Sequence, residues 1–144
     1  ATNDRIVIIE DTLELQCSAP DTVFLRAKEG VATMNDLLRA TMRLRPDRIV
    51  VGEVRGPEAL SLLKAWNTGH PGGCATVHAN SARAGLTRLE QLIQEAVITV
   101  PKELIAEAVN IVIHIERSGH GRKIREIAKV EGTEGGKYLM NRIV

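Results

Sequence analysis

The sequence is poor in aromatic residues and in cysteine. Of 144 residues only Phe24, Trp66 and Tyr138 are aromatic, too few to stack a series of nucleobases, so we expect no direct nucleic-acid readout. The hydrophobic core must therefore be built from Ile, Val and Leu. The two cysteines, Cys17 and Cys74, lack C-x-x-C spacing, which indicates either buried, reduced thiols of a cytosolic protein or a single disulfide.

The sequence also lacks an excess of charge and a long apolar run. Its 19 Lys and Arg residues nearly balance 18 Asp and Glu residues, so net charge gives no reason to expect binding to nucleic acid or to an anionic membrane. No apolar run reaches about 18 residues, the length needed to span a bilayer, and no signal-peptide pattern is present. The sequence does not begin with Met and enters an aliphatic run at Ile6. We therefore expect a piece of a longer protein.

Aliphatic runs alternate with amphipathic segments along the first part of the sequence. The runs at 6–9 and 49–51 are typical of strands that are buried on both faces of a parallel sheet. Between them we expect a short hairpin around 19–21. A helix should begin near Thr33, whose hydroxyl can form a capping box with Asp36.

The rest of the sequence continues this alternation and then turns to strands. The predicted elements are helices from Gly56–Pro57, around 86–96 and at 101–109, and strands at 72–81, 110–116, 123–131 and 137–144. Together these elements predict an α/β fold: a parallel sheet core flanked by helices, with additional C-terminal strands, in a single domain over residues 1–144.

A phosphate-binding loop of the G-x-x-x-x-G-K-[ST] type is missing. The nearest candidate is "GTEGGKY", residues 132–138. It places Gly132 one residue too close to Gly136, has Tyr138 where Ser or Thr is needed, and lies between two predicted strands. We interpret it as a hairpin turn.

Two of the predicted strands end in acidic residues. Glu10 and Asp11 follow the run at 6–9, and Glu53 follows the run at 49–51 after one glycine. Ligands of open α/β sheets bind at the carboxyl ends of the strands, where carboxylates can hold magnesium-bound water or orient an attacking one. Strand ends also carry charge simply because they reach solvent, but two acidic ends on neighbouring strands favour a site.

Histidines and an arginine lie close to these strand ends in the sequence. His70, Cys74 and His78 are four residues apart, which on a helix would suggest a metal site, but the proline and two glycines at 71–73 oppose a helix. On a strand, His78 would lie at the carboxyl end, where it could donate to a phosphate or act as a hydrogen-bonded structural residue. Arg55 could stabilise phosphoryl-transfer charge. We interpret His114 and His120 as structural or solvated.

Three segments resemble, in order, the motifs of the type II/IV secretion ATPases. "RIVIIEDTLEL" resembles the Asp box, "RLRPDRIVVGEVRGPEAL" the Walker B region and "TGHPGGCATVHANSARAGLTRLEQL" the His box. Within this superfamily the sequence is most similar to the conjugal-transfer ATPases of the TrbB type, over about residues 5–116. The resemblance implies a RecA-like domain of the P-loop NTPase superfamily that uses ATP and Mg²⁺. It also implies a cytoplasmic hexameric ring, peripherally associated with the inner membrane and its channel components, that drives substrate transfer or pilus assembly.

The resemblance also assigns roles to individual residues. It implies that Glu10 orients the attacking water and that Glu53 binds Mg²⁺ through water or shares the polarising role. The two histidines would link the phosphate site to subunit contacts. The candidate catalytic residues are Glu10, Glu53, Arg55 and His78, and the candidate cofactor-binding residues are Asp11, Glu14 and His70.

The sequence departs from the family pattern at its beginning. In the family, the phosphate loop and its helix precede the Asp-box strand, whereas this sequence begins only a few residues before that strand. We therefore expect an incomplete P-loop NTPase domain with an uncovered sheet edge, inactive as an isolated chain. Two alternatives stay open: a non-catalytic module that assembles into a ring, or a metal-dependent hydrolase built on His70, His78, Glu10 and Glu53.

Overall fold

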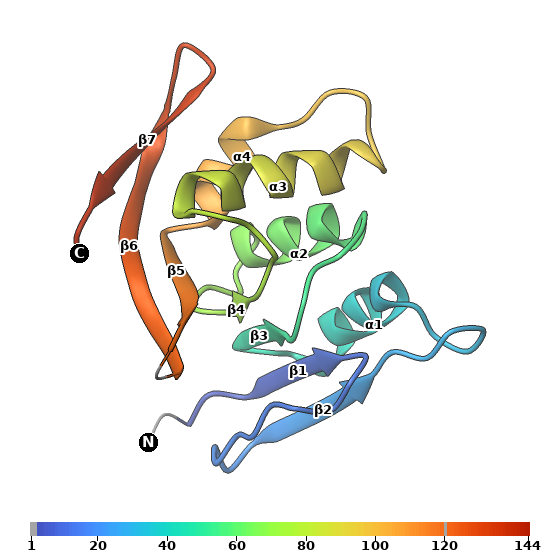
Figure 1. Ribbon diagram of the computed structural model, residues 1–144. Coiled ribbons are helices and arrows are strands. Elements are labelled where there is room, and N and C mark those ends of the chain that lie inside the picture. Colours follow the sequence, from blue (N-terminus) through green and yellow to red (C-terminus); the bar gives the residue numbers. More distant parts are fainter. Residues whose placement is uncertain (1–2, 120) are drawn as a thin grey trace. The chain divides into compact units, whose positions relative to one another are not determined.

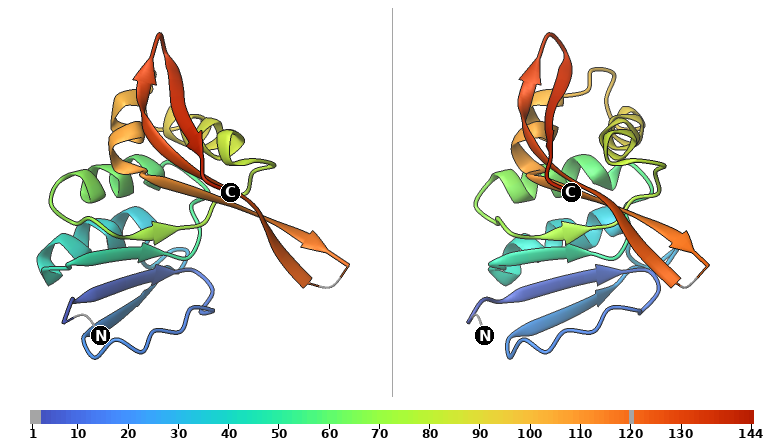
Figure 2. Two further views of the ribbon diagram at one scale, coloured as in Figure 1. Left: turned by 90° about the vertical axis from the view of Figure 1, so that its left-hand side faces the viewer. Right: turned by 60° about the vertical axis from the view of Figure 1, so that its left-hand side comes forward.

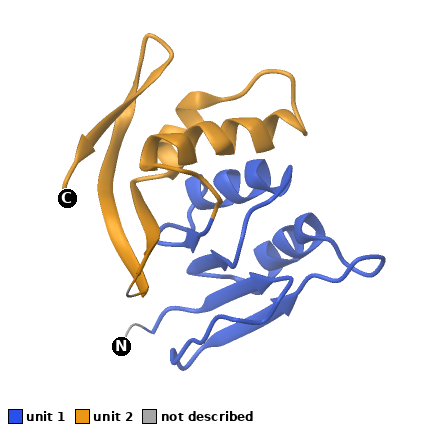
Figure 3. Ribbon diagram, in the orientation of Figure 1, with its two compact units in different colours: residues 1–76 blue, residues 77–144 orange. Residues whose placement is uncertain are grey.

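The computed structural model describes residues 3–119 and 121–144, which divide into two units. The first unit ends at Thr76 and the second begins at Val77 (Figure 3). His120, one of the histidines discussed above, lies outside the described residues. The single domain expected from the sequence remains a prediction, and each unit is described by itself.

The first unit contains a parallel four-stranded sheet (Figure 1). Its strands are β1 (Ile6–Glu10), β2 (Thr22–Arg26), β3 (Arg48–Val51) and β4 (Cys74–Ala75), in the order β2-β1-β3-β4. Strand β1 pairs with β2 on one side and with β3 on the other, and its side chains Val7, Ile8 and Ile9 are all buried. The predicted pair of buried parallel strands is confirmed.

The prediction of a hairpin around 19–21 is wrong. These residues belong to an irregular connection, and the strand that follows it, β2, runs parallel to β1. The Arg5 guanidinium bonds the Asp21 carboxylate at 2.9 Å, and the Ile6 N–H donates to the Asp21 carbonyl at 2.9 Å. These bonds bring the start of β2 beside the start of β1, so the two strands run in the same direction.

Two helices and a 3₁₀ turn complete the first unit: α1 (Met34–Thr41), η1 (Met42–Leu44) and α2 (Glu58–Asn67). The predicted capping box is present, because Thr33 Oγ1 accepts from the Asp36 N–H and the Asp36 carboxylate accepts from the Thr33 N–H. Helix α1 contacts both β1 and α2. Helix α2 begins one residue later than expected, with Pro57 as its N-cap, and its buried side chains are Ala59, Leu62, Leu63 and Ala65.

Glycine is required where the chain passes under Trp66 on its way to β4. The indole N–H of Trp66 donates to the Ile49 carbonyl at 3.1 Å. A Cβ atom at Gly73 would lie 2.1 Å from that carbonyl oxygen and 2.3 Å from the indole nitrogen, so no larger residue fits. Strand β4 that follows is shorter than the predicted strand at 72–81. It ends at Ala75, and at the next residue the Thr76 hydroxyl donates to the Gly52 carbonyl at 2.6 Å while the Thr76 carbonyl accepts the Val54 N–H at 2.9 Å.

The second unit contains three antiparallel strands and two helices. The strands are β5 (Ile111–Ser118), β6 (Gly121–Glu134) and β7 (Lys137–Arg142), in the order β5-β6-β7, and the helices are α3 (Ala82–Gln94) and α4 (Lys102–Ala108). Both helices contact β6, and α3 also contacts β5. Figure 2 shows the long β6 strand leaving its pairing with β5 and bending to pair with β7.

A two-residue turn joins β6 to β7. Gly135 and Gly136 both have positive φ angles, 56° and 74°, as a type I′ hairpin turn requires. The interpretation of "GTEGGKY" as a hairpin, rather than as a phosphate loop, is confirmed.

Both cysteines are free thiols. Cys17 is half-buried and Cys74 is exposed, so the expected burial is wrong for Cys74, whose two-residue strand lies at the edge of the sheet.

Candidate functional site

The acidic ends of β1 and β3 lie side by side in the first unit. The two strands are parallel neighbours with Ile9 opposite Val51, and the Gly52 N–H donates to the Ile9 carbonyl at 2.9 Å. A Cβ atom at residue 52 would lie 3.0 Å from Cγ of Glu10, closer than most side-chain contacts. Glycine at this position therefore lets the Glu10 side chain pack against the end of β3, next to Glu53.

Glu10 is almost fully buried, with 2% of its surface exposed. Its Oε1 accepts the N–H groups of Glu14 and Leu15, both at 3.0 Å. Its Oε2 is also buried but has no hydrogen-bond partner among the described residues. Buried carboxylate oxygens are normally satisfied, so this atom is suited to meet a water or a bound ion. Glu14 contributes its main-chain N–H, and its side chain is exposed.

Arg55 bridges the two acidic strand ends. Its Nη1 bonds Asp11 Oδ2 at 2.6 Å and its Nη2 bonds Glu53 Oε2 at 2.5 Å. The arginine side chain is 60% exposed and that of Glu53 only 17%, so the bridge closes over Glu53 from the solvent side. The hydrogen bond to Glu53, followed by the charges of Glu53 and Asp11, raises the pKa of Arg55.

Two supporting residues were not identified from the sequence. The Glu58 carboxylate accepts the N–H groups of Arg55 at 2.8 Å and of Gly56 at 2.9 Å, which fixes the turn that carries the arginine. An acid in the first turn of a predicted helix is the signal that could have indicated it. Thr76, whose hydroxyl bonds the Gly52 carbonyl, holds the chain just before Glu53. Thr76 lies inside the predicted strand at 72–81, so no signal in the sequence indicated this role.

The two candidate histidines are not brought together with the acids in the first unit. His70 Nδ1 lies 2.7 Å from the Pro46 carbonyl oxygen. Pro46 precedes β3 and Glu53 follows it, so His70 lies at the opposite end of that strand from Glu53. His78 is an exposed loop residue of the second unit. The roles that the resemblance implies for both histidines stay predictions.

The acids of this site suit magnesium better than a transition metal. Magnesium prefers oxygen ligands, keeps several waters and is commonly held by one or two carboxylates together with substrate phosphates. Glu10 and Glu53 offer such carboxylates, and within the described part of the chain Oε2 of Glu10 has no hydrogen-bond partner. Over residues 3–119 and 121–144 there is no group of three or more His, Cys, Asp or Glu residues placed to hold a metal ion. The metal-hydrolase alternative therefore gains no support from the described residues.

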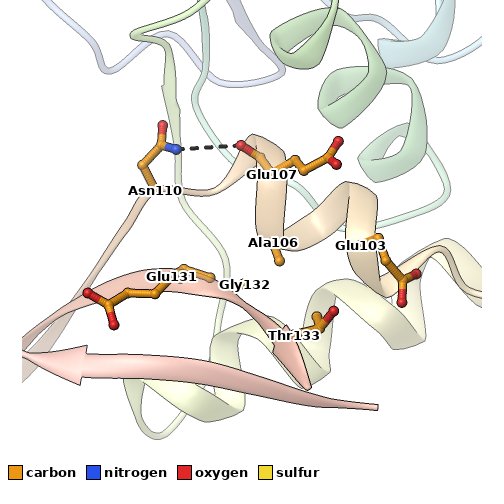
Figure 4. Close-up of a pocket in the computed structure, with 8 residues that line it drawn as sticks. Glu103, Ala106, Glu107, Asn110, Glu131, Gly132 and Thr133 are labelled. Carbon is orange, nitrogen blue, oxygen red and sulfur yellow. Dashed lines mark hydrogen bonds between the residues drawn. The ribbon is translucent and has the colours of Figure 1, made fainter. Parts of the chain in front are cut away.

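A separate cavity lies in the second unit between α4 and β6 (Figure 4). It has a volume of about 360 Å³, and Asn110 at its rim donates a hydrogen bond to the Glu107 carbonyl at 3.5 Å. Three of its lining residues, Glu103, Glu107 and Glu131, carry carboxylates. Their negative charge would repel the phosphates of a nucleotide, so this cavity does not fit the predicted ligand.

Comparisons with known proteins agree with the fold and with the motifs. The chain is 54% identical over 138 residues to the conjugal transfer protein TrbB of Rhizobium radiobacter, covering 96% of this chain and 42% of that protein. It is 31% identical to the protein VirB11 of Agrobacterium fabrum, covering 86% of this chain and 39% of that one. The chain thus spans about two-fifths of the length of these relatives.

Similarity in structure extends to a solved secretion ATPase. The crystal structure of the VirB11 ATPase from the Brucella suis type IV secretion system, in complex with sulphate, matches with a TM-score of 0.80 and 29% identity. The match covers 88% of this chain and 40% of that one, and it confirms the α/β, RecA-like fold class. None of the described helices is long and apolar enough to cross a membrane. Because the family model for type II/IV secretion system proteins matches residues 1–134, the chain belongs to that family.

Proposed function

We propose that this chain is the C-terminal part of a hexameric motor ATPase that drives substrate transfer or pilus assembly in a secretion or conjugation system. Family membership and similarity to TrbB and VirB11 support the motor class. The observation that carries the proposal is the buried Glu10 carboxylate at the end of β1, one oxygen of which has no partner among the described residues, on the strand that neighbours β3 and its terminal acid. We place the protein in the cytoplasm, peripherally associated with inner-membrane channel components.

The proposal gives Glu10 and Glu53 different roles. Bound Mg²⁺–ATP supplies the electrophilic phosphorus and the charge neutralisation that phosphoryl transfer needs. Glu10 accepts a hydrogen bond from the attacking water through Oε2, while its Oε1 is held by two main-chain N–H groups and keeps the carboxylate from rotating. Glu53 would hold the magnesium ion through its water shell. Asp11 stays close to Glu53 through Arg55.

The phosphate chain needs a further binding segment. The sequence holds no glycine-rich phosphate loop, and the chain covers about 42% of its relative TrbB. We propose that the remaining part of the protein contributes this loop and the ring contacts, so that the isolated chain neither hydrolyses ATP nor binds it at millimolar concentration.

A chimera with a relative tests the function directly. The segment of Rhizobium radiobacter TrbB that corresponds to this chain is replaced by the chain, and magnesium-dependent ATP hydrolysis is measured. We expect the chimera to hydrolyse ATP and the Glu10→Gln and Glu53→Gln chimeras to lose at least about a hundredfold in kcat, in line with typical losses at general-base and electrostatic positions. Glu29→Gln, at an exposed glutamate in a turn of the first unit, is the matched control.

The outcomes separate the proposal from its alternative. Hydrolysis by the isolated chain that Glu53→Gln abolishes would show that phosphates are held without a separate loop. A chimera that forms the ring but hydrolyses no ATP, although it is cooperatively folded in a thermal melt, would favour the non-catalytic assembly module.

A further inference from the structure

The connection between β1 and β2, residues 11–21, has no helix or strand of its own. It is tied to the rest of the first unit near its start. Glu10 accepts the N–H groups of Glu14 and Leu15, and Arg26 Nε donates to the Asp11 carbonyl at 3.2 Å. The fourth tie is the ion pair of Asp11 with Arg55. This last tie joins the connection to the end of β3, where Glu53 lies.

The guanidinium of Arg55 contacts a carboxylate through each of its two terminal nitrogens. One terminal nitrogen bonds Asp11 and the other bonds Glu53, so both arms of the planar fork point at carboxylates. The base of the side chain is also fixed, because the Glu58 carboxylate accepts the N–H groups of Arg55 and Gly56 at the first turn of α2.

We propose that Arg55 is a positioning residue that acts through Asp11 and Glu53. It holds the Glu53 carboxylate in place and ties the β1–β2 connection, with the Glu10 carboxylate anchored to it, to the end of β3. A cation that draws Glu53 away from Arg55 loosens this bridge, so the position of the connection depends on whether Glu53 is engaged. The inference rests on the proposed function for the catalytic role of Glu53, but the bridge itself does not.

Hydrogen exchange of two amides tests the bridge in the isolated chain. In Arg55→Gln we expect the amides of Glu14 and Leu15 to exchange about two- to tenfold faster than in the unsubstituted chain, the size expected for exposed ion pairs. Arg43→Gln, at an exposed arginine of η1, is the matched control and should leave both rates unchanged. Arg55→Lys keeps the charge but loses the planar fork, so its rates should lie between those of the unsubstituted chain and of Arg55→Gln.

Two further measurements distinguish positioning from a general loss of stability. In an Asp11→Asn background, Arg55→Gln should change the exchange rates little further, since the partner is already lost. The ¹⁵N spectrum should show separate, slowly exchanging Nη signals for Arg55 but not for Arg43, and these should merge in Asp11→Asn or Glu53→Gln. Amides in the core of β1 should be unaffected in every variant, which verifies that each one folds.

Any one of three results would overturn the inference. The amides of Glu14 and Leu15 could exchange equally fast in Arg55→Gln and Arg43→Gln, the effects of Arg55→Gln and Asp11→Asn could be additive, or the Nη groups of Arg55 could rotate freely. None of these measurements uses nucleotide. If the chimera hydrolyses no ATP while the exchange effects of Arg55 and Asp11 are non-additive, the proposed function fails and the positioning role stands. If the chimera is active but the effects are additive, the positioning role alone fails.

Discussion

The two sheets of this chain are built from similar aliphatic runs but bury them differently. The "IVII" run of β1 lies between two parallel strands and is buried almost throughout, whereas the "IVIHI" run of β5 alternates between half-buried and exposed residues. Ile111, Ile113 and Ile115 on β5 each expose about half of their surface. An aliphatic run therefore indicates a strand, but the cover on its two faces depends on elements elsewhere in the chain. The buried sheet is the one that ends in the candidate site.

Truncation of one isoleucine in each sheet should give the largest contrast. Ile9 of β1 is fully buried and Ile113 of β5 is 51% exposed. We expect Ile9→Ala to lower the free energy of unfolding by about 2–5 kcal/mol, because it removes buried methyl groups and leaves a cavity. Ile113→Ala should lower the free energy of unfolding by less than about 1 kcal/mol. Urea unfolding followed by circular dichroism measures both, and equal losses would mean that the β5 face is covered in solution.

Alanine in place of one glycine of each unit should act in opposite directions. A Cβ at Gly73 would meet the Ile49 carbonyl at 2.1 Å, whereas one at Gly85 in α3 would meet only Val112, at an ordinary 3.7 Å. We expect Gly73→Ala to lower the free energy of unfolding by roughly 2–4 kcal/mol through overpacking. Gly85→Ala should raise the free energy of unfolding by about 0.5–1 kcal/mol, since alanine favours a helix. A thermal melt of each variant tests the pair, and a neutral Gly73→Ala would contradict the close approach under Trp66.

The two units also differ in how firmly a carboxylate holds the main chain. Glu10 is buried and accepts two main-chain N–H groups at 3.0 Å, while the half-buried Glu126 accepts one, from Ala82, at 3.2 Å. Glu10→Ala should lower the free energy of unfolding by about 1–3 kcal/mol, since it leaves the buried N–H donors unpaired. Glu126→Ala should lower the free energy of unfolding by about half as much or less. Hydrogen exchange around residues 14–15 and around residue 82 reports each loss locally, and equal effects would weaken the anchoring role of Glu10.

Acid should weaken the N-terminus of α1 before that of α3 once Glu126, which bonds the first residue of α3, is replaced by glutamine. The Thr33 hydroxyl, followed by the Thr33 N–H, lowers the pKa of Asp36 below its ordinary 3.8. A lowered folded-state pKa means that this stabilisation is present above pH 3.8 and is lost as the pH falls through the folded value. At α3 the cap is the Ser81 hydroxyl, which does not titrate in this range, but the Glu126 carboxylate also accepts the Ala82 N–H. In a Glu126→Gln background, amides of the first turn of α1 should lose protection in acid before those of α3, and adding Asp36→Asn should remove the difference.

Local signals in the sequence predicted local features well. The Thr33–Asp36 capping box and the Gly135–Gly136 turn depend on residues that are neighbours in the chain, so their chemistry can be identified without knowing the fold. The adjacency of Glu10 and Glu53 was also predictable, because parallel strands align their carboxyl ends. The hairpin around 19–21 was wrong because the direction of β2 depends on a contact between Arg5 and Asp21, which neighbouring residues do not reveal.

The finer geometry of the candidate site depends on side-chain directions. Alternation predicted His78 on a strand, but β4 ends earlier, at Ala75, and the Thr76 hydroxyl that follows bonds the Gly52 carbonyl. The sequence places Arg55 beside Glu53 but does not show that its second arm reaches Asp11 across 44 positions of the chain. The orphaned oxygen of Glu10 depends likewise on which oxygen the N–H groups of Glu14 and Leu15 occupy.

Trp66 gives the first unit a built-in optical probe. It is the one tryptophan of the sequence, and its indole N–H is bonded to the main chain of β3, the strand that leads to Glu53. Indole emission is sensitive to the loss of such a bond, so a shift of β3 on ligand binding should change the fluorescence without any attached label. The chain can therefore report strand movement at the candidate site by its own emission.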